Sequence, residues 1–196
     1  MLPHGALGRV FAWLMDRLNT PAYRRAADAL DPMAGSSVLE IGFGTGGLAV
    51  RLAPRLGEGL LAGLDPSPLM VRQARRRLER LGLPVRIDLR EGTDRSLNWP
   101  PQTFSHIAAL HSFQFWEAPR ETLARLRGLL EPGGHLLLIL RFHGSRAPAW
   151  LPNPISRGGA ELEGTLEALQ EAGFTAVTQH PPVGRSAVLT ARRERA

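Results

Sequence analysis

Short apolar stretches alternate with segments of helical periodicity along most of this chain. Buried strands are predicted where apolar residues run together over a few positions, at 37–41, 60–64, 85–89, 107–110 and 136–140. Between these strands, leucines recur every three or four residues, as at Leu123, Leu126 and Leu130, which is the spacing of one helix face. Strands that alternate with helices predict an α/β fold, in which helices cover both faces of a parallel sheet.

The two ends of the chain depart from this alternation. Two short helices are predicted at 7–19 and 21–30, separated by Thr20-Pro21, which combines a capping residue with a first-turn proline. Near the other end, strands are predicted at 174–179 and 186–191. The link between them is short and contains Pro and Gly, which favours an antiparallel hairpin because parallel neighbours need a longer crossover.

The 196 residues are predicted to form a single domain, because the chain contains no internal repeat and no dividing linker. Residues 1–33 are expected to form an N-terminal helical cap on a core that spans 34–196. Residues 143–159 are rich in Pro, Gly and Arg, and a long loop is predicted there.

The basic residues change this picture little. The formal net charge is +6, and all 24 basic residues are Arg. The densest run, 72–80, also carries apolar residues at helical spacing, so its Arg side chains are expected on the solvated back of a helix. Nucleic-acid binding through this face is therefore not expected.

The content of Cys and His and the length of the apolar runs exclude several kinds of site and a membrane span. The chain has no Cys, which excludes disulfides, thiolate nucleophiles and thiolate metal sites. Its six His residues show no metal-ligand spacing, and no metal is expected. The longest apolar run, 136–140, is far too short to span a bilayer, and no signal-peptide pattern opens the chain. A cytoplasmic enzyme of unknown oligomeric state is the resulting expectation.

A Gly-rich turn follows the first buried strand and carries the clearest chemical signal. Glycines at this place let the backbone approach a ligand, and the next helix offers its N-terminal amides. Residues 42–47 also satisfy the dinucleotide pattern, so the turn alone leaves two ligand classes open. Glu40, at the strand end, would repel a pyrophosphate and attract a ligand that carries an ammonium and a sulfonium. Asp65 ends the second strand about twenty residues on, where its carboxylate can accept hydrogen bonds from both ribose hydroxyls.

Three segments together resemble a known family. Val38-Leu39-Glu40-Ile41-Gly42-Phe43-Gly44-Thr45-Gly46 is similar to motif I of the class I S-adenosylmethionine-dependent methyltransferases. Residues 64–70 resemble their second motif, and 127–136 resemble the segment that leads into their fifth strand. The likeness runs in order from about 34 to 142 and is nearest to small-molecule enzymes of the quinone-biosynthesis type. It implies a Rossmann-like, mostly parallel seven-stranded sheet whose last strand is antiparallel.

The resemblance also implies which residues bind S-adenosylmethionine. Glu40 would lie near its amino group, and Asp65 would hold its ribose. The cofactor-binding set as a whole is Glu40, Gly42, Phe43, Gly44, Gly46, Asp65, Pro66, Met70, Thr93 and Asp94. Two positions depart from the family pattern. The Asp that usually reaches the adenine amino group is Thr93 here, with Asp94 next to it, and the usual Phe-Asp that enters the fourth strand is Phe104-Ser105.

The methyl acceptor is expected at the end of the fourth strand, beside the switch point of the sheet. His111 is the candidate general base, although a base is needed only where the acceptor must lose a proton. Tyr23, Phe113, Phe115 and Trp116 are candidates for the acceptor pocket, which suits a small, partly apolar molecule. Two alternatives remain open at this point: a nicotinamide-dependent oxidoreductase, and a non-catalytic adenosine-binding regulator on the same fold.

Overall fold

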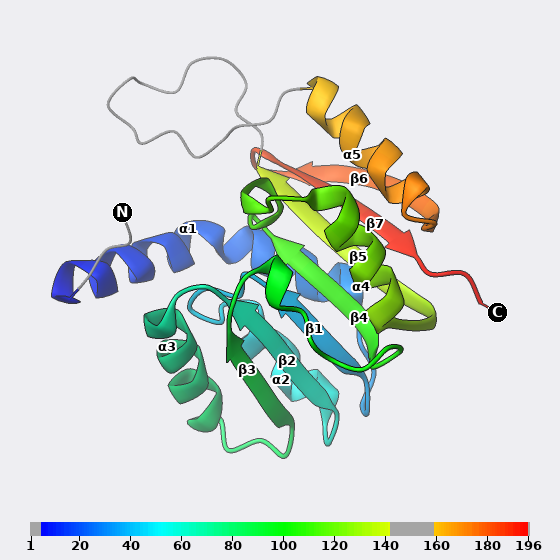
Figure 1. Cartoon of the computed structure of the whole chain (residues 1–196). Coiled ribbons are helices and arrows are strands. Elements are labelled where there is room, and N and C mark those ends of the chain that lie inside the picture. The colour runs from blue at the N-terminus through cyan, green and yellow to red at the C-terminus, as the bar shows by residue number, and fades with distance from the viewer. Residues whose placement is uncertain (1–4, 142–158, 196) are drawn as a thin grey trace, which may run out of the picture.

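Seven strands form one mixed sheet at the centre of the molecule (Figure 1). The computed structural model describes residues 5–141 and 159–195, with side chains from 16 to 141 and from 162 to 195. The strands are β1 (Ser37–Ile41), β2 (Leu60–Asp65), β3 (Arg86–Glu91), β4 (Phe104–Leu110), β5 (Leu130–Arg141), β6 (Thr175–Val183) and β7 (Ser186–Arg192). Their order in the sheet is β3-β2-β1-β4-β5-β7-β6. The first five strands pair with one another in parallel, and β7 is antiparallel to both β5 and β6. The predicted sheet and its antiparallel last strand are therefore confirmed.

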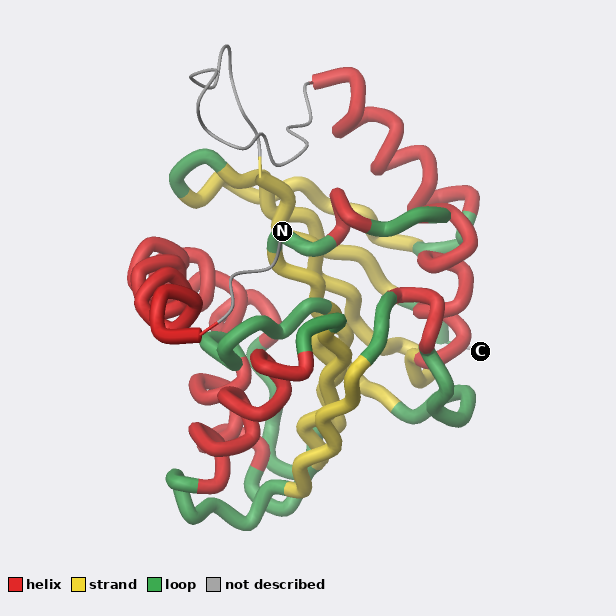
Figure 2. Tube along the Cα trace, turned by 60° about the vertical axis from the view of Figure 1, so that its left-hand side comes forward, coloured by secondary structure: helices red, strands yellow, loops and turns green. Residues whose placement is uncertain are grey.

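Helices cover both faces of the sheet. The α-helices are α1 (Gly5–Leu30), α2 (Ala49–Leu56), α3 (Pro68–Glu79), α4 (Pro119–Leu129) and α5 (Gly159–Glu171), with two short 3-10 turns, η1 (Asp94–Ser96) and η2 (Phe113–Phe115). Helices α1, α2 and α3 lie on one face and α4 and α5 on the other, as the tube view shows (Figure 2). None of the helices in the described part of the chain is both long and apolar enough to cross a membrane.

Alternation along β1 decides which of its side chains face each helical layer. Leu39 and Ile41 belong to the buried cluster under α4 and α5. Val38 belongs to the cluster under α1, α2 and α3, and Glu40 points to that same face because it lies two positions further on. A carboxyl group is thus carried into an apolar layer by the register of the strand.

The N-terminal helix corrects one expectation. The sequence predicted two helices separated at Pro21, whereas α1 is continuous and includes this proline. Proline removes one backbone hydrogen bond, and it usually kinks or ends a helix. Here Ala26 and Leu30, beyond the proline, are fully buried in the cluster on this face of the sheet. Packing of that face outweighs the lost bond, because tertiary contacts supply most of the stability of helices in proteins.

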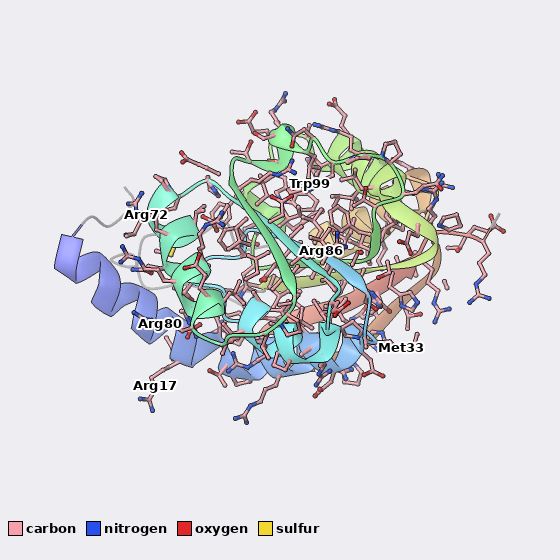
Figure 3. The ribbon with its side chains drawn as sticks, turned by 90° about the horizontal axis from the view of Figure 1, so that it is seen from below. Arg17, Met33, Arg72, Arg80, Arg86 and Trp99 are labelled. Atoms are coloured by element: carbon pink, nitrogen blue, oxygen red, sulfur yellow. The ribbon has the colours of Figure 1, made fainter. Side chains whose placement is uncertain are left out.

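The Arg-rich helix α3 has the expected amphipathic arrangement. Ala74 and Leu78 are buried against the sheet, while Arg72 and Arg80 are exposed. Seen from below, these two Arg side chains point away from the helix into solvent (Figure 3). Arg72 and Arg80 thus lie on the outer face as expected, whereas Arg77 reaches Asp16 and the Thr45 carbonyl, and Arg75 reaches the Leu89 carbonyl.

Candidate functional site

A pocket of about 280 Å³ opens where β1 meets both β2 and β4. This is the switch point of the sheet, because the chain continues from β1 to β2 on one side and reaches β4 on the other. The loops that follow these strands converge there. The lining residues are Ile41, Gly42, Leu64, Asp65, Pro66, Gly92, Thr93, Asp94, His111, Ser112, Phe115, Trp116 and Glu117.

The Gly-rich turn approaches its neighbours too closely for side chains. Gly42 has a φ of 75°, and a Cβ atom added there would lie 2.4 Å from the Cβ of Ser112. The Ser112 hydroxyl in turn donates to the Ile41 carbonyl over 2.6 Å. At the other end of the turn, a Cβ on Gly47 would lie 2.3 Å from the Cε2 atom of Tyr23. Glycine is needed at these two positions because loop and helix pack directly on the backbone.

Asp65 connects the turn to the end of β2. Its Oδ2 atom accepts a hydrogen bond from the Gly44 amide over 2.8 Å, and Oδ1 accepts from the Ser67 amide over 2.9 Å. Burial raises the pKa of Asp65, and the two amide hydrogen bonds oppose that rise because they favour the carboxylate. Asp65 also lines the pocket, and each of its carboxylate oxygens can accept a further hydrogen bond.

Glu40 is a buried acid with an unsatisfied oxygen. Its side chain is 2% exposed, and Oε2 has no hydrogen-bond partner among the described residues. Burial, reinforced by the negative charge of Asp65, raises the pKa of Glu40 to about 8, against a smaller lowering by the Ala49 amide. Buried polar atoms of this kind are rare, and a cationic group nearby would satisfy both the orphan oxygen and the charge.

Helix α1 is tied to the Gly-rich turn by a contact that the sequence analysis missed. The Thr45 hydroxyl donates to Asp16 Oδ1 over 3.0 Å, and Arg77 donates to Asp16 Oδ2 over 3.2 Å. Arg77 also donates to the Thr45 carbonyl. These three residues are far apart in the chain, and no local pattern distinguishes Asp16 from an ordinary exposed acid of a helix.

Tyr23 lies in the same layer as this contact. Burial, together with the negative charges of Glu40 and Asp16, raises its pKa to about 12, so its hydroxyl stays protonated. Tyr23 lines neither the pocket above nor the second pocket described below. Its predicted role in the acceptor pocket remains a prediction.

The other residues of the predicted cofactor set fall into two groups. Pro66, Thr93 and Asp94 line the pocket together with Gly42 and Asp65. Phe43, Gly44, Gly46 and Met70 do not line it. The Phe43 ring is buried in the cluster under α1–α3, and Gly46 packs closely on Ala74.

Thr93 and Asp94 have structural partners at the pocket wall. Thr93 caps η1, with its Oγ1 accepting from the Arg95 amide. Asp94 is buried, and its Oδ2 accepts from the Thr122 hydroxyl over 2.8 Å. Asp94 lies next to Thr93, the position where the family usually has an adenine-binding Asp. Its side chain is therefore held against α4.

His111 is held in an unusual backbone conformation at the end of β4. Its φ of 52° lies in the left-handed region, which non-glycine residues adopt rarely and often at functional sites. The His111 amide donates to the Ile139 carbonyl, and Gln114 Nε2 donates to the His111 carbonyl, so both backbone groups are fixed. The ring atom Nε2 shares a hydrogen bond of 2.9 Å with the Ser186 hydroxyl. Burial, helped by the positive charge of Arg141, lowers the pKa of His111 to about 4, so the imidazole is neutral at ordinary pH.

A second pocket, of about 300 Å³, lies on the other side of His111. It is lined by Leu18, Asn19, Pro21, Ala22, His111, Arg141, Val183, Gly184, Arg185 and Ser186. Of the described residues, His111 alone appears in the walls of both pockets. Ser186 was not recognised in the sequence, where it follows Arg185 in a hairpin turn without a distinguishing pattern.

The aromatic residues after β4 separate into a buried pair and an exposed ring. Phe113 is fully buried, and its ring lies 4.8 Å from that of Trp116. Trp116 nevertheless reaches the wall of the first pocket, as does Phe115, which is 61% exposed. None of the three lines the second pocket.

Comparisons with known proteins decide the family. Residues 38–134 match the family model described as "Methyltransferase domain". A carboxy-S-adenosyl-L-methionine synthase of Chromohalobacter salexigens is 30% identical, in a match that covers 84% of this chain and 73% of that protein. The chain belongs to the class I S-adenosylmethionine-dependent methyltransferases. The predicted family is thus confirmed, and S-adenosylmethionine is the cofactor of this methyltransferase.

Further matches agree with this assignment. A demethylmenaquinone methyltransferase of Thermus thermophilus is 32% identical over 59% of this chain, and the match spans 52% of that protein's length. The solved structure of a SAM-dependent methyltransferase from Aquifex aeolicus has a TM-score of 0.76 at 21% identity, covering 93% of this chain and 97% of that one. The first match supports the quinone-biosynthesis type, and the second confirms the fold. The family model and the matched relatives favour a methyltransferase over an oxidoreductase.

Proposed function

We propose that this methyltransferase binds S-adenosylmethionine in the first pocket and a small-molecule acceptor in the second. The observation that carries the proposal is that the two pockets share one wall residue, His111. A group that faces both ligands can hold the acceptor atom in line with the methyl group. Such positioning is the main contribution that an enzyme makes to this reaction, because proximity and orientation can supply roughly 7–11 kcal/mol.

The residues of the first pocket fit the cofactor. Glu40 does not line this pocket, but its orphan oxygen, on the strand residue two positions before Gly42, suits the ammonium of the methionine part. Asp65 suits the ribose, since its carboxylate faces the pocket and each oxygen has a second acceptor site. Pro66, Thr93 and Asp94 form the part of the wall that suits the adenine. Phe43, Gly44, Gly46 and Met70 would act through the backbone of the turn or by shaping its packing.

The N-terminal residues 1–33 would act as the cap over both ligands. Helix α1 contacts the Gly-rich turn through Asp16, and its next turns supply Leu18, Asn19, Pro21 and Ala22 to the second pocket. Helix α1 would thereby couple the conformation of the Gly-rich turn to the shape of the acceptor pocket.

The chemistry proposed for the site needs little from the protein beyond orientation. When bound, the cofactor supplies a methyl group on a sulfonium, which is already an activated leaving group. His111, neutral and hydrogen-bonded to Ser186, would accept a proton from an acceptor that carries one. The Ser186 hydroxyl would fix the ring orientation, so Ser186 is a positioning residue.

Small-molecule acceptors are supported by the relatives, which include a demethylmenaquinone methyltransferase and an erythromycin 3''-O-methyltransferase. Binding to nucleic acid is not expected, and a cytoplasmic location remains a prediction from the sequence.

The test of the function is release of S-adenosylhomocysteine from S-adenosylmethionine across a panel of small acceptors, including hydroquinones. Calorimetry with S-adenosylhomocysteine and NAD is the parallel binding test. The proposal expects turnover with at least one acceptor and no NAD binding. An enzyme that binds the cofactor but methylates nothing would support the adenosine-binding regulator instead.

A further inference from the structure

The second pocket has a strong charge asymmetry. Two of its wall residues are Arg141 and Arg185, and none of the described residues that line it is Asp or Glu. The remaining wall is neutral, with Asn19, His111 and Ser186 as polar groups and Leu18, Pro21, Ala22 and Val183 as apolar ones. A pocket of this composition favours a ligand that combines an apolar body with a negative charge.

Arg141 is held in place by a neutral partner. It ends β5 and is half-buried, and its Nη2 donates to the Oδ1 atom of Asn19 over 3.0 Å. No carboxylate of the described residues forms an ion pair with Arg141. Charged side chains that are withdrawn from water are normally paired, so a half-buried guanidinium without a carboxylate has room for an anionic partner.

The neighbouring sequence offers little to neutralise it. Residues 142–158 follow Arg141 directly and contain two Arg and no Asp or Glu, and residues 1–15 contain no acid either.

We propose that the second pocket selects a small organic anion, a carboxylate or a phosphate monoester, and that Arg141 and Arg185 bind its charged group. The inference rests on the proposed function, because it names the acceptor class of the same site. A guanidinium suits such groups, since its planar array of N–H donors matches two oxygens at once. The apolar wall from α1 and Val183 would hold the body of the molecule.

The same arrangement would link acceptor binding to His111. Arg141 lowers the pKa of His111 by its positive charge, in addition to the larger effect of burial. An anion bound to Arg141 offsets that charge, so the pKa of His111 rises when the acceptor arrives. For an acceptor that also carries a proton, the imidazole is then a stronger base in the complex than in the free protein.

Calorimetry on protein saturated with S-adenosylhomocysteine tests the inference with three probes of similar shape: benzoate, phenyl phosphate and the neutral benzamide. At least one anion is expected to bind tenfold or more tightly than benzamide, and added salt should weaken it. Arg141→Gln and Arg185→Gln should each weaken that anion about tenfold and change benzamide less than twofold. Comparison of benzoate with phenyl phosphate separates the two anion classes.

Arg86→Gln is the matched control, because it removes the same charge from an exposed side chain at the start of β3. It should leave all three affinities unchanged. Equal binding of anions and benzamide, no binding of either anion, or the same loss in Arg86→Gln would overturn the inference. The affinity for S-adenosylhomocysteine, measured first, is independent of these outcomes. A protein that does not bind S-adenosylhomocysteine would count against the proposed function. Normal binding of S-adenosylhomocysteine without a preference for anions would count against the anionic acceptor alone.

Discussion

The backbone amide of Gly44 donates a hydrogen bond to the Oδ2 atom of Asp65 over 2.8 Å. This bond joins the Gly-rich turn after β1 to the acid at the end of β2, 21 residues away. Because the Ser67 amide occupies the other oxygen, one carboxylate orients both loops of the pocket wall. The protein itself thus positions Asp65 toward the pocket, which reduces the ordering needed when a ligand binds.

Replacement of Asp65 by Asn should weaken S-adenosylhomocysteine binding by tenfold or more. Hydrogen bonds to a charged group are worth about 1.5–3 kcal/mol each, and two ribose hydroxyls would lose their charged acceptor. Titration calorimetry measures the loss, and an unchanged melting temperature shows that the fold is retained. Glu79→Gln, on the exposed side of α3, serves as control. Unchanged affinity in folded Asp65→Asn would remove Asp65 from the cofactor site.

Cofactor binding should release a proton from Glu40 near pH 7. The pKa of this group is raised to about 8, so the free protein holds the proton, and a nearby ammonium favours the carboxylate. Calorimetry in buffers of different ionisation enthalpy measures the released proton. Glu40→Gln should abolish the release. Release of the same size in the variant would assign the proton to another group.

The same carboxyl makes stability depend on pH. Its folded pKa lies above the unfolded value of 4.5, so the stabilisation is complete below about pH 4.5 and is lost as the pH rises toward 8. Thermal unfolding of the wild type and Glu40→Gln at several pH values isolates this effect from other titrating groups. We expect the wild type to lose stability relative to the variant between these limits. Parallel curves would show that Glu40 does not titrate there.

Gly42→Ala should destabilise the protein and weaken cofactor binding. The new Cβ would lie 2.4 Å from that of Ser112, and alanine is strained at a φ of 75°. We expect about 1–3 kcal/mol from the overpacking and roughly 1 kcal/mol or more from the backbone. Adding Ser112→Gly should recover the free energy lost to overpacking but not the backbone strain. A double-mutant cycle of denaturant unfolding can separate the two contributions. A cycle without coupling between the two sites would contradict the contact.

His111→Asn should reduce turnover while leaving S-adenosylhomocysteine binding nearly unchanged. Asparagine tolerates the left-handed backbone that His111 adopts, so the substitution removes the imidazole with little added strain. In Arg141→Gln the pKa of His111, followed by NMR, should rise from its lowered value of about 4. A turnover rate equal to that of the wild type with a proton-bearing acceptor would exclude a base role for His111.

Much of this protein was determined by local sequence. The strands β1 and β2, the Gly-rich turn and the position of Asp65 follow from short apolar runs and from glycines where the backbone needs them. The antiparallel hairpin at the end follows from a link too short for a crossover. Each of these features depends on neighbours in the chain, so one sequence is enough to predict it.

Only the tertiary structure decided how the second pocket is built. Arg141 meets Asn19 across 122 residues, and His111 meets Ser186 across 75. The continuity of α1 through Pro21 places Asn19 there, and it depends on burial of the helix against the sheet. Pairings of this kind are selected by the packing of distant elements, whose free energy is absent from any local pattern. Short segments of sequence therefore determine the fold and the cofactor motif, whereas the packing of distant elements brings together the charges proposed to select the acceptor.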